Sequence, residues 1–203
     1  MRLSFTYLPA LTLSLLLNPA FAASRTSAGL AWANQLWVPM SGFTSPGTCI
    51  SSYYTWSPQP VTPTARNSAS FAVPFEFVPM LWGCTDDYIN PFNAAVARNF
   101  DNVNLTRSKD ILGFNEPDLA VQSNCSPERA AEVWKSTLEP LKAKGYRLGS
   151  PAVTGGPGGK EWMREWFKAC AGGCNPDFVA VHWVSSPRHY PSILRRCDSE
   201  KEH

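Results

Sequence analysis

The chain has 203 residues and a formal net charge of +2, and 44% of its residues are hydrophobic. This length allows one domain with a hydrophobic core. Because the charge is nearly balanced and the first basic cluster is Arg195-Arg196 near the end, we expect no nucleic-acid binding. The three histidines do not lie at ligand spacing from a cysteine pair, so we also expect no metal site.

The first 22 residues have the pattern of a secretory signal peptide. A positive start at Arg2 is followed by the apolar segment Leu8–Leu17 and by Ala20-Phe21-Ala22, a small-residue cleavage site. The apolar segment is too short to cross a bilayer, and no later stretch is long enough. We therefore expect a secreted, extracellular protein, with the cell wall as one location, that has no membrane contact once residues 1–22 are removed.

Three segments in the first half of the chain are rich in β-favouring residues and predict strands at 27–32, 50–58 and 75–83. Pro79 lies inside the third segment and indicates a bulge or a strand end, because proline has no N–H for the ladder. A short helix is predicted from Pro91 to Phe100, with the proline in its first turn.

The second half of the chain alternates strands and helices more clearly. Strands are predicted at 111–114, 146–152 and 177–184, and helices at 126–145 and 160–170. The longer helix has Ser126 as N-cap, Pro127 at its first position and Gly145 at its end. This alternation indicates an α/β protein with a parallel sheet, and strands about thirty residues apart are typical of a (β/α) barrel.

The strand at 111–114 ends in the polar motif Asn115-Glu116-Pro117-Asp118. Pro117 favours an extended conformation for Glu116, at the edge of the sheet where catalytic side chains of (β/α) folds project. An acid there can protonate the leaving oxygen of a glycoside, and the amide of Asn115 can hold a sugar hydroxyl. The alternative is an ordinary strand end at which Asp118 caps the next turn.

Several of the predicted strands finish in an aromatic or polar side chain: Trp56, Trp82, Glu116, His182 and Trp183. The carboxyl ends of parallel strands share one edge, so these side chains are expected along one aromatic and polar site. Sugar contact is one role for the tryptophans and core packing is the other. For His182 the alternative is a hydrogen-bonded histidine inside the core.

Six cysteines in a secreted chain predict disulfides. Cys170 and Cys174 are separated by Ala171-Gly172-Gly173 and can close a small loop. Cys84 and Cys125 both follow strand-like segments and can join neighbouring loops. Asn104 and Asn124 lie in glycosylation acceptor motifs.

These features resemble the fungal Asl1-like glycoside hydrolases of family 128, the endo-β-1,3-glucanases. The shared segments are 53–56, 77–83, 113–118, 148–152 and 177–183. The resemblance implies a (β/α)8 TIM-barrel glycosidase that cleaves β-1,3-glucan polysaccharide or oligosaccharide by a retaining mechanism, without a cofactor. It assigns Glu116 as general acid/base and Asn115, Trp56, Trp82, His182 and Trp183 as substrate-binding residues. We expect the protein to be a monomer.

The family pattern is lost after Trp183. The resemblance implies a nucleophilic Glu at the end of a seventh strand, whereas Glu200 and Glu202 here lie in a charged tail without a strand-like run before them. We therefore expect about six of eight β/α units at residues 23–184, a non-family tail at 185–203, a C-terminally truncated barrel and no hydrolysis by this chain. The alternatives are a non-catalytic β-glucan-binding wall protein and a non-functional fragment.

Overall fold

The computed structural model describes residues 28–32, 43, 50–61, 75–98 and 109–182. The predicted signal peptide at 1–22, the tail at 185–203, Asn104 and Trp183 lie outside these residues. No helix among the described residues is long and apolar enough to cross a membrane.

The strands of the described residues are all paired in parallel. Strands β1 (Ala28–Ala31), β2 (Ile50–Tyr54) and β3 (Glu76–Phe77) form one sheet in the order β1-β2-β3, and β4 (Asp110–Ile111) pairs with β5 (Arg147–Leu148). Parallel bridges join Met80 to Leu112 and Gly149 to Phe178. The pairing therefore follows chain order from β1 to Phe178, as the alternating pattern predicts.

The strands are shorter than the sequence predicts, and the segment at 177–184 contributes a single bridge at Phe178 instead of a strand. Pro79 explains part of the shortening of β3, because proline has no N–H to donate to the neighbouring strand. Pairing with the next strand continues around it: Leu112 N–H donates to the Pro79 carbonyl at 2.9 Å, and Leu81 N–H donates to the Leu112 carbonyl at 3.0 Å. The pairs present give a (β/α) glycosidase fold; the incomplete barrel of about six of eight β/α units stays a prediction.

Two helices begin earlier than predicted. Helix α1 spans Asp86–Ala97 and contains Pro91 in its interior, so the prediction of a start at Pro91 was wrong. The negative charges of Asp86 and Asp87 in the first turn favour the earlier start, because they face the positive end of the helix dipole. Helix α3 spans Pro157–Cys170, where Pro157 occupies the first turn.

The long predicted helix is present and changes its hydrogen-bond pattern along its length. It consists of α2 (Pro127–Val133), a π turn η3 (Trp134–Leu138) and a 3-10 segment η4 (Glu139–Lys144). Ser126 Oγ accepts from Arg129 N–H at 3.2 Å as N-cap, and Gly145 ends the helix with a φ of 83°. Pro140 cannot donate an α-helical bond, which accounts for the irregular second half.

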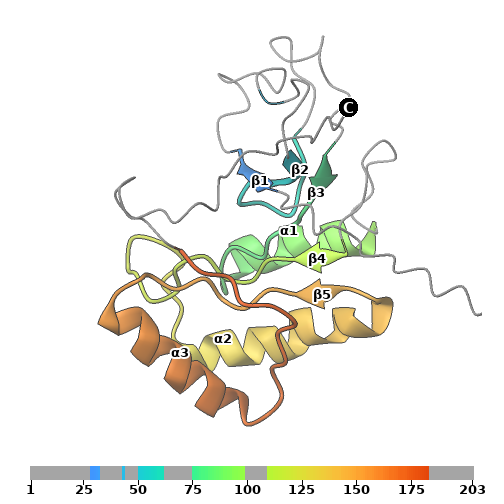
Figure 1. Ribbon diagram of the computed structural model, residues 1–203. Helices are drawn as coiled ribbons and strands as arrows, with labels where there is room; N and C mark the ends of the chain where they lie inside the picture. Colours follow the sequence, from blue (N-terminus) through green and yellow to red (C-terminus); the bar gives the residue numbers. More distant parts are fainter. Residues whose placement is uncertain (1–27, 33–42, 44–49, 62–74, 99–108, 183–203) are drawn as a thin grey trace, which may run out of the picture.

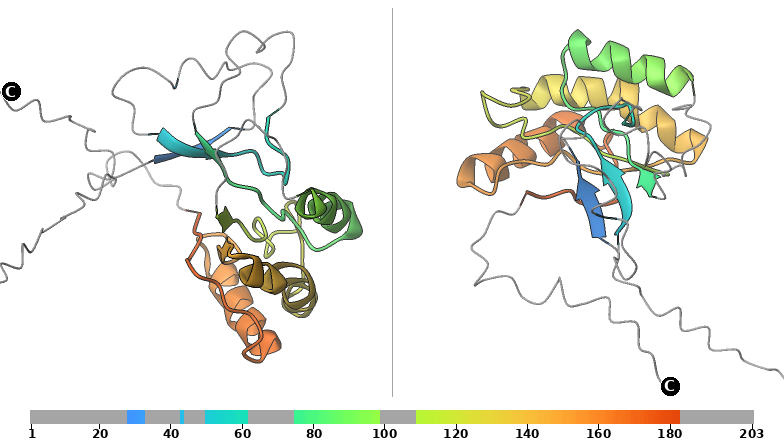
Figure 2. Two further views of the ribbon diagram at one scale, coloured as in Figure 1. Left: turned by 90° about the vertical axis from the view of Figure 1, so that its right-hand side faces the viewer. Right: turned by 90° about the horizontal axis from the view of Figure 1, so that it is seen from above.

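The helices form an outer layer on one side of the strands (Figure 1), and the two turned views in Figure 2 show the same arrangement. The larger core lies between β4, β5 and these helices and includes Ile111, Phe114, Trp134, Leu148 and Trp166. A second apolar cluster includes side chains of β2 and β3 and contains Trp32, Tyr53, Val61, Phe75 and Phe77.

Candidate active site

Glu116 lies where β4 ends and is fixed to the end of the neighbouring strand segment. Its N–H donates to the Ala152 carbonyl at 2.7 Å, and Asn115 forms a parallel bridge with Ala152. The Leu119 N–H then donates to the Glu116 carbonyl at 3.0 Å, which turns the chain sharply away from the sheet. Glu116 is thus at the carboxyl edge of the sheet, the edge at which the parallel strands end.

The backbone of Glu116 is left-handed, with a φ of 41°. The expectation of an extended Glu116 was therefore wrong. The bonds to Ala152 and from Leu119 outweigh the local preference set by Pro117. A non-glycine residue in this region costs free energy, and such positions are concentrated at functional sites.

The carboxylate of Glu116 meets the imidazole of His182. His182 Nδ1 lies 2.6 Å from Glu116 Oε1, and their side chains are 28% and 21% exposed. With the carboxylate ionised, the Nδ1–H group donates; with the carboxyl protonated, its O–H donates to an unprotonated Nδ1. The pair can therefore hold a proton at the Glu116 oxygen or release it while the hydrogen bond remains.

Asn115 is buried beside this pair, at 3% exposure. Its N–H donates to the Trp82 carbonyl at 3.0 Å, and its Nδ2 donates to Gln122 Oε1 at 3.0 Å. Its Oδ1 is buried and has no hydrogen-bond partner within the described part of the chain. A buried acceptor without a partner is costly, so this oxygen is suited to accept from a hydroxyl group of a bound ligand.

Asp118 fastens the turn after Glu116 to the loop after β5. Its Oδ1 accepts from Thr154 N–H at 3.0 Å, and its Oδ2 accepts a short hydrogen bond from Thr154 Oγ1. The carboxylate is thus engaged across two loops and does not act as the local cap that the alternative reading gave it. The next loop residue, Gly155, lies beside the His182 carbonyl.

Two of the three predicted tryptophan platforms lie in the described residues, and both are partly exposed. The Trp82 ring lies 4.6 Å from the Tyr88 ring, and the Trp82 carbonyl is bonded to Asn115. The Trp56 ring lies 4.7 Å from that of Tyr54. Trp82 is therefore adjacent to the Glu116 pair through the backbone, whereas Trp56 is one strand further along the edge.

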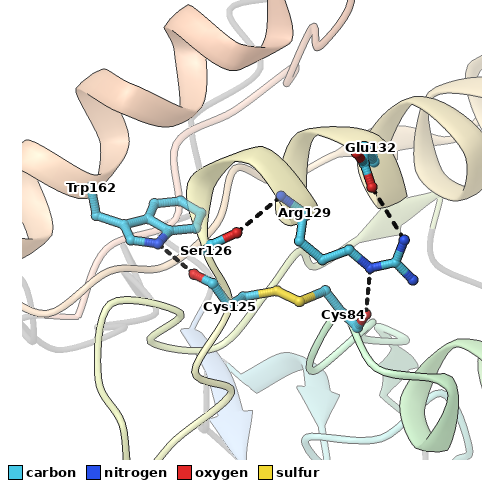
Figure 3. Close-up of a disulfide and its surroundings, with 6 residues drawn as sticks. All are labelled: Cys84, Cys125, Ser126, Arg129, Glu132 and Trp162. Carbon is cyan, nitrogen blue, oxygen red and sulfur yellow. Dashed lines mark hydrogen bonds and ion pairs between the residues drawn. A yellow bond between two sulfur atoms is a disulfide. The ribbon is translucent and has the colours of Figure 1, made fainter.

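Both predicted disulfides are present. Cys84 is joined to Cys125 with 6.1 Å between Cα atoms, and Cys170 is joined to Cys174 with 5.4 Å. Figure 3 shows the first of them between the loop that follows Trp82 and the start of α2. The glycosylation candidate Asn124 is exposed and directly precedes Cys125.

The described residues contain no cluster of three or more metal-ligating side chains. Sequence reasoning did not find Gln122, Thr154 or the pairing of Glu116 with His182. Gln122 and Thr154 are ordinary loop residues by type, and only folding brings them to Asn115 and Asp118. The one available signal was their position, since both follow strands that end at the same edge.

Comparison with known proteins identifies relatives of this chain. Residues 29–190 match the family model described as glycosyl hydrolase catalytic core. Alkali-sensitive linkage protein 1 of Schizosaccharomyces pombe is 32% identical over 160 residues, which are 76% of this chain and 26% of that protein.

Two solved structures extend the comparison. A family 128 (subgroup III) curdlan-specific exo-β-1,3-glucanase from Blastomyces gilchristii is 39% identical with a TM-score of 0.60, over 76% of this chain and 60% of that one. A subgroup II endo-β-1,3-glucanase from Sorangium cellulosum is 27% identical with a TM-score of 0.56, over 76% and 59%. The chain thus spans about a quarter of the curated relative and three fifths of the solved ones.

Proposed function

The chain belongs to the glycosyl hydrolase catalytic-core family, and from that premise we propose that its Glu116 site is the acid/base half of a β-1,3-glucan hydrolase site. The hydrogen bond of 2.6 Å between Glu116 Oε1 and His182 Nδ1 carries this proposal. It holds a carboxyl group at the carboxyl edge of a parallel sheet, partly exposed, with a second titratable group against it. General acid/base catalysis needs a side chain so placed.

The surroundings of Glu116 fit a sugar. Asn115 offers an unpartnered buried acceptor, Oδ1, for a sugar hydroxyl. The partly exposed Trp82, whose carbonyl accepts from Asn115 N–H, offers an aromatic ring at the neighbouring strand end. The glucanases to which the chain is similar act on β-1,3-glucan by their descriptions. We assign Asn115, Trp82 and His182 to the sugar unit at Glu116, and Trp56 to a unit further along the edge.

A retaining glycosidase has a second carboxylate about 5–5.5 Å from the first, which attacks the anomeric carbon. We assign no residue of the described part of the chain to this second role. In our proposal these residues bind β-1,3-glucan at the cell wall after secretion and supply the acid/base half of a retaining site. A non-catalytic glucan-binding protein is the second candidate, favoured by the same unpartnered Asn115 oxygen.

Azide can test the acid/base role of Glu116, because it can attack the anomeric carbon in place of a nucleophilic carboxylate while Glu116 donates a proton to the leaving oxygen. The secreted chain and its Glu116→Gln variant would be incubated with laminarin, with and without azide. Bound glucan, released reducing ends and glycosyl azide would be measured. We expect both proteins to bind laminarin, and glycosyl azide to form with the unmodified chain alone.

Each outcome separates the candidates. Binding without product under any condition supports the glucan-binding protein, and absence of both binding and product supports a non-functional fragment. Hydrolysis without azide at ordinary glycosidase rates, unchanged by Glu116→Gln, contradicts the assignment of Glu116, because loss of an acid/base group costs about 10²–10⁴-fold in rate.

A further inference from the structure

The loop from Glu116 to Cys125 returns to its own start through a series of hydrogen bonds. Cys125 N–H donates to the Pro117 carbonyl at 2.9 Å, and Ser123 N–H donates to the Asn115 carbonyl at 3.4 Å. The Gln122 side chain accepts from Asn115 Nδ2 at 3.0 Å. The far end of this loop is therefore bonded directly to the residues on either side of Glu116.

Cys125 is also the point at which this loop is attached to the rest of the molecule. Its sulfur is bonded to Cys84, two residues after Trp82, and its carbonyl accepts from Trp162 Nε1 at 2.7 Å (Figure 3). Arg129 Nε donates to the Cys84 carbonyl at 3.3 Å from the first turns of α2. Helices α2 and α3 and the loop that carries Trp82 thus all converge on one disulfide.

We infer that the Cys84–Cys125 disulfide is a positioning element of the candidate active site: it holds Asn115 and Glu116 in fixed relation to Trp82, so that sugar binding depends on it. The two cysteines are 4% and 3% exposed, so the crosslink is inside the packed structure. The inference rests on the proposed function where sugar affinity is measured. The hydrogen bond between Glu116 and His182 provides a second measurement, which needs no sugar.

The second disulfide provides a matched control. Cys170 and Cys174 close a five-residue loop at the end of α3, with a sequence separation of 4 against 41 for Cys84–Cys125. Among the described contacts, Gly173 in this loop lies against Lys135, and Asn175 donates to Glu139. Loss of this crosslink removes a disulfide of the same chemistry without touching the Glu116 loop.

The test compares the full secreted chain with two double variants, Cys84→Ala/Cys125→Ala and Cys170→Ala/Cys174→Ala. Laminaritriose affinity would be measured by calorimetry at a temperature at which each protein is folded. Nitrogen NMR of the His182 imidazole would report its hydrogen bond to Glu116 without ligand. We expect the first variant to lose about tenfold in affinity, because a loosened loop and its side chains must be ordered on binding, and to show an altered His182 signal.

The control variant should bind within about twofold of the unmodified chain and keep the His182 signal. Equal affinities and equal His182 signals in all three proteins would overturn the inference. Failure of the unmodified chain to bind laminaritriose would reject the proposed sugar site, whereas the His182 signal would still decide the positioning role.

If the alanine pair does not fold, Cys84→Val with Cys125→Ala restores apolar volume without a crosslink. Should this pair also fail to fold while the control folds, the disulfide stabilises the whole domain and the positioning role is rejected.

Discussion

His182 Nδ1 and Glu116 Oε1 lie 2.6 Å apart although 66 residues separate them in the chain. Glu116 follows strand β4 and His182 follows the bridged residue Phe178. They meet because Gly149 pairs with Phe178 and Asn115 pairs with Ala152. Ser150 Oγ adds a fixed point, since it accepts from Ala180 N–H at 3.0 Å two residues before His182. The geometry of this pair is therefore a property of the sheet.

Substitution of His182 by alanine should remove this hydrogen bond and leave the Glu116 carboxylate without its partner. We expect the free energy of unfolding to fall by about 1.5–3 kcal/mol, the range for a hydrogen bond to a charged group. Urea denaturation at pH 7 measures it. Val181→Ala is the matched control, because Val181 is 71% exposed on the same segment and should change stability by less than about 0.5 kcal/mol. Equal stability of the two variants would contradict the prediction.

Thr154→Val tests the link between the Glu116 turn and the loop after β5. The valine keeps the branched shape but cannot donate to Asp118 Oδ2, which retains the Thr154 N–H bond alone. A loss of about 1–2 kcal/mol in unfolding free energy is expected, measured by urea denaturation. Thr85→Val serves as comparison, since Thr85 is exposed and its side chain makes no capping bond; a similar loss there would show that the effect is not specific to Asp118.

Two carboxylates should make the fold sensitive to acid. Partial burial opposes ionisation of Glu139, but hydrogen bonds from Asn175 and the Trp134 indole outweigh it and lower its pKa. Hydrogen bonds from Lys142 and from Leu148 N–H lower the pKa of Asp177. Both groups bind protons more tightly in the unfolded chain, so their stabilisation is complete above about pH 4.5 and is lost as pH falls through the lower folded values.

Urea denaturation at pH 6 and pH 3 measures this loss. Glu139→Gln/Asp177→Asn should show a smaller fall in unfolding free energy between the two pH values than the unmodified chain. Glu161→Gln is the control, because Glu161 pairs with Arg164 at 58% exposure of both side chains and should not change the pH dependence. An unaltered pH dependence in the double variant would refute the assignment.

The close approach of β4 and β5 predicts that Gly113 cannot be enlarged. A Cβ atom there would lie 2.9 Å from the Gly149 carbonyl oxygen and 3.2 Å from the Pro151 nitrogen, both backbone atoms that cannot move aside independently. Gly113→Ala should cost about 1–3 kcal/mol of unfolding free energy. Gly158→Ala meets no atom within 4 Å in the first turn of α3 and should be neutral or stabilise by up to about 1 kcal/mol. Thermal denaturation compares the two.

The sequence by itself determined the elements whose signals are local. Ser126 and Gly145 mark the ends of the long helix because an N-cap oxygen and a left-handed glycine satisfy backbone groups within a few residues. The alternation of strands and helices determined parallel pairing, and the apolar run before Asn115 placed Glu116 at a strand end. Resemblance added the glycosidase family, which the match over residues 29–190 confirms.

Only the tertiary structure decided the left-handed backbone of Glu116, its bond to His182, and the fastening of Asp118 to Thr154. Pro117 favours extended backbone locally, but the bond from Glu116 N–H to the Ala152 carbonyl comes from another strand and overrides that preference. The start of α1 at Asp86 is a different case, because the charges of Asp86 and Asp87 in its first turn are a local signal that the prediction of a start at Pro91 did not use. Thr154 lies 36 residues after Asp118, and His182 lies 66 residues after Glu116. Neither pair produces a periodic pattern in the sequence, because its contact depends on the register between strands.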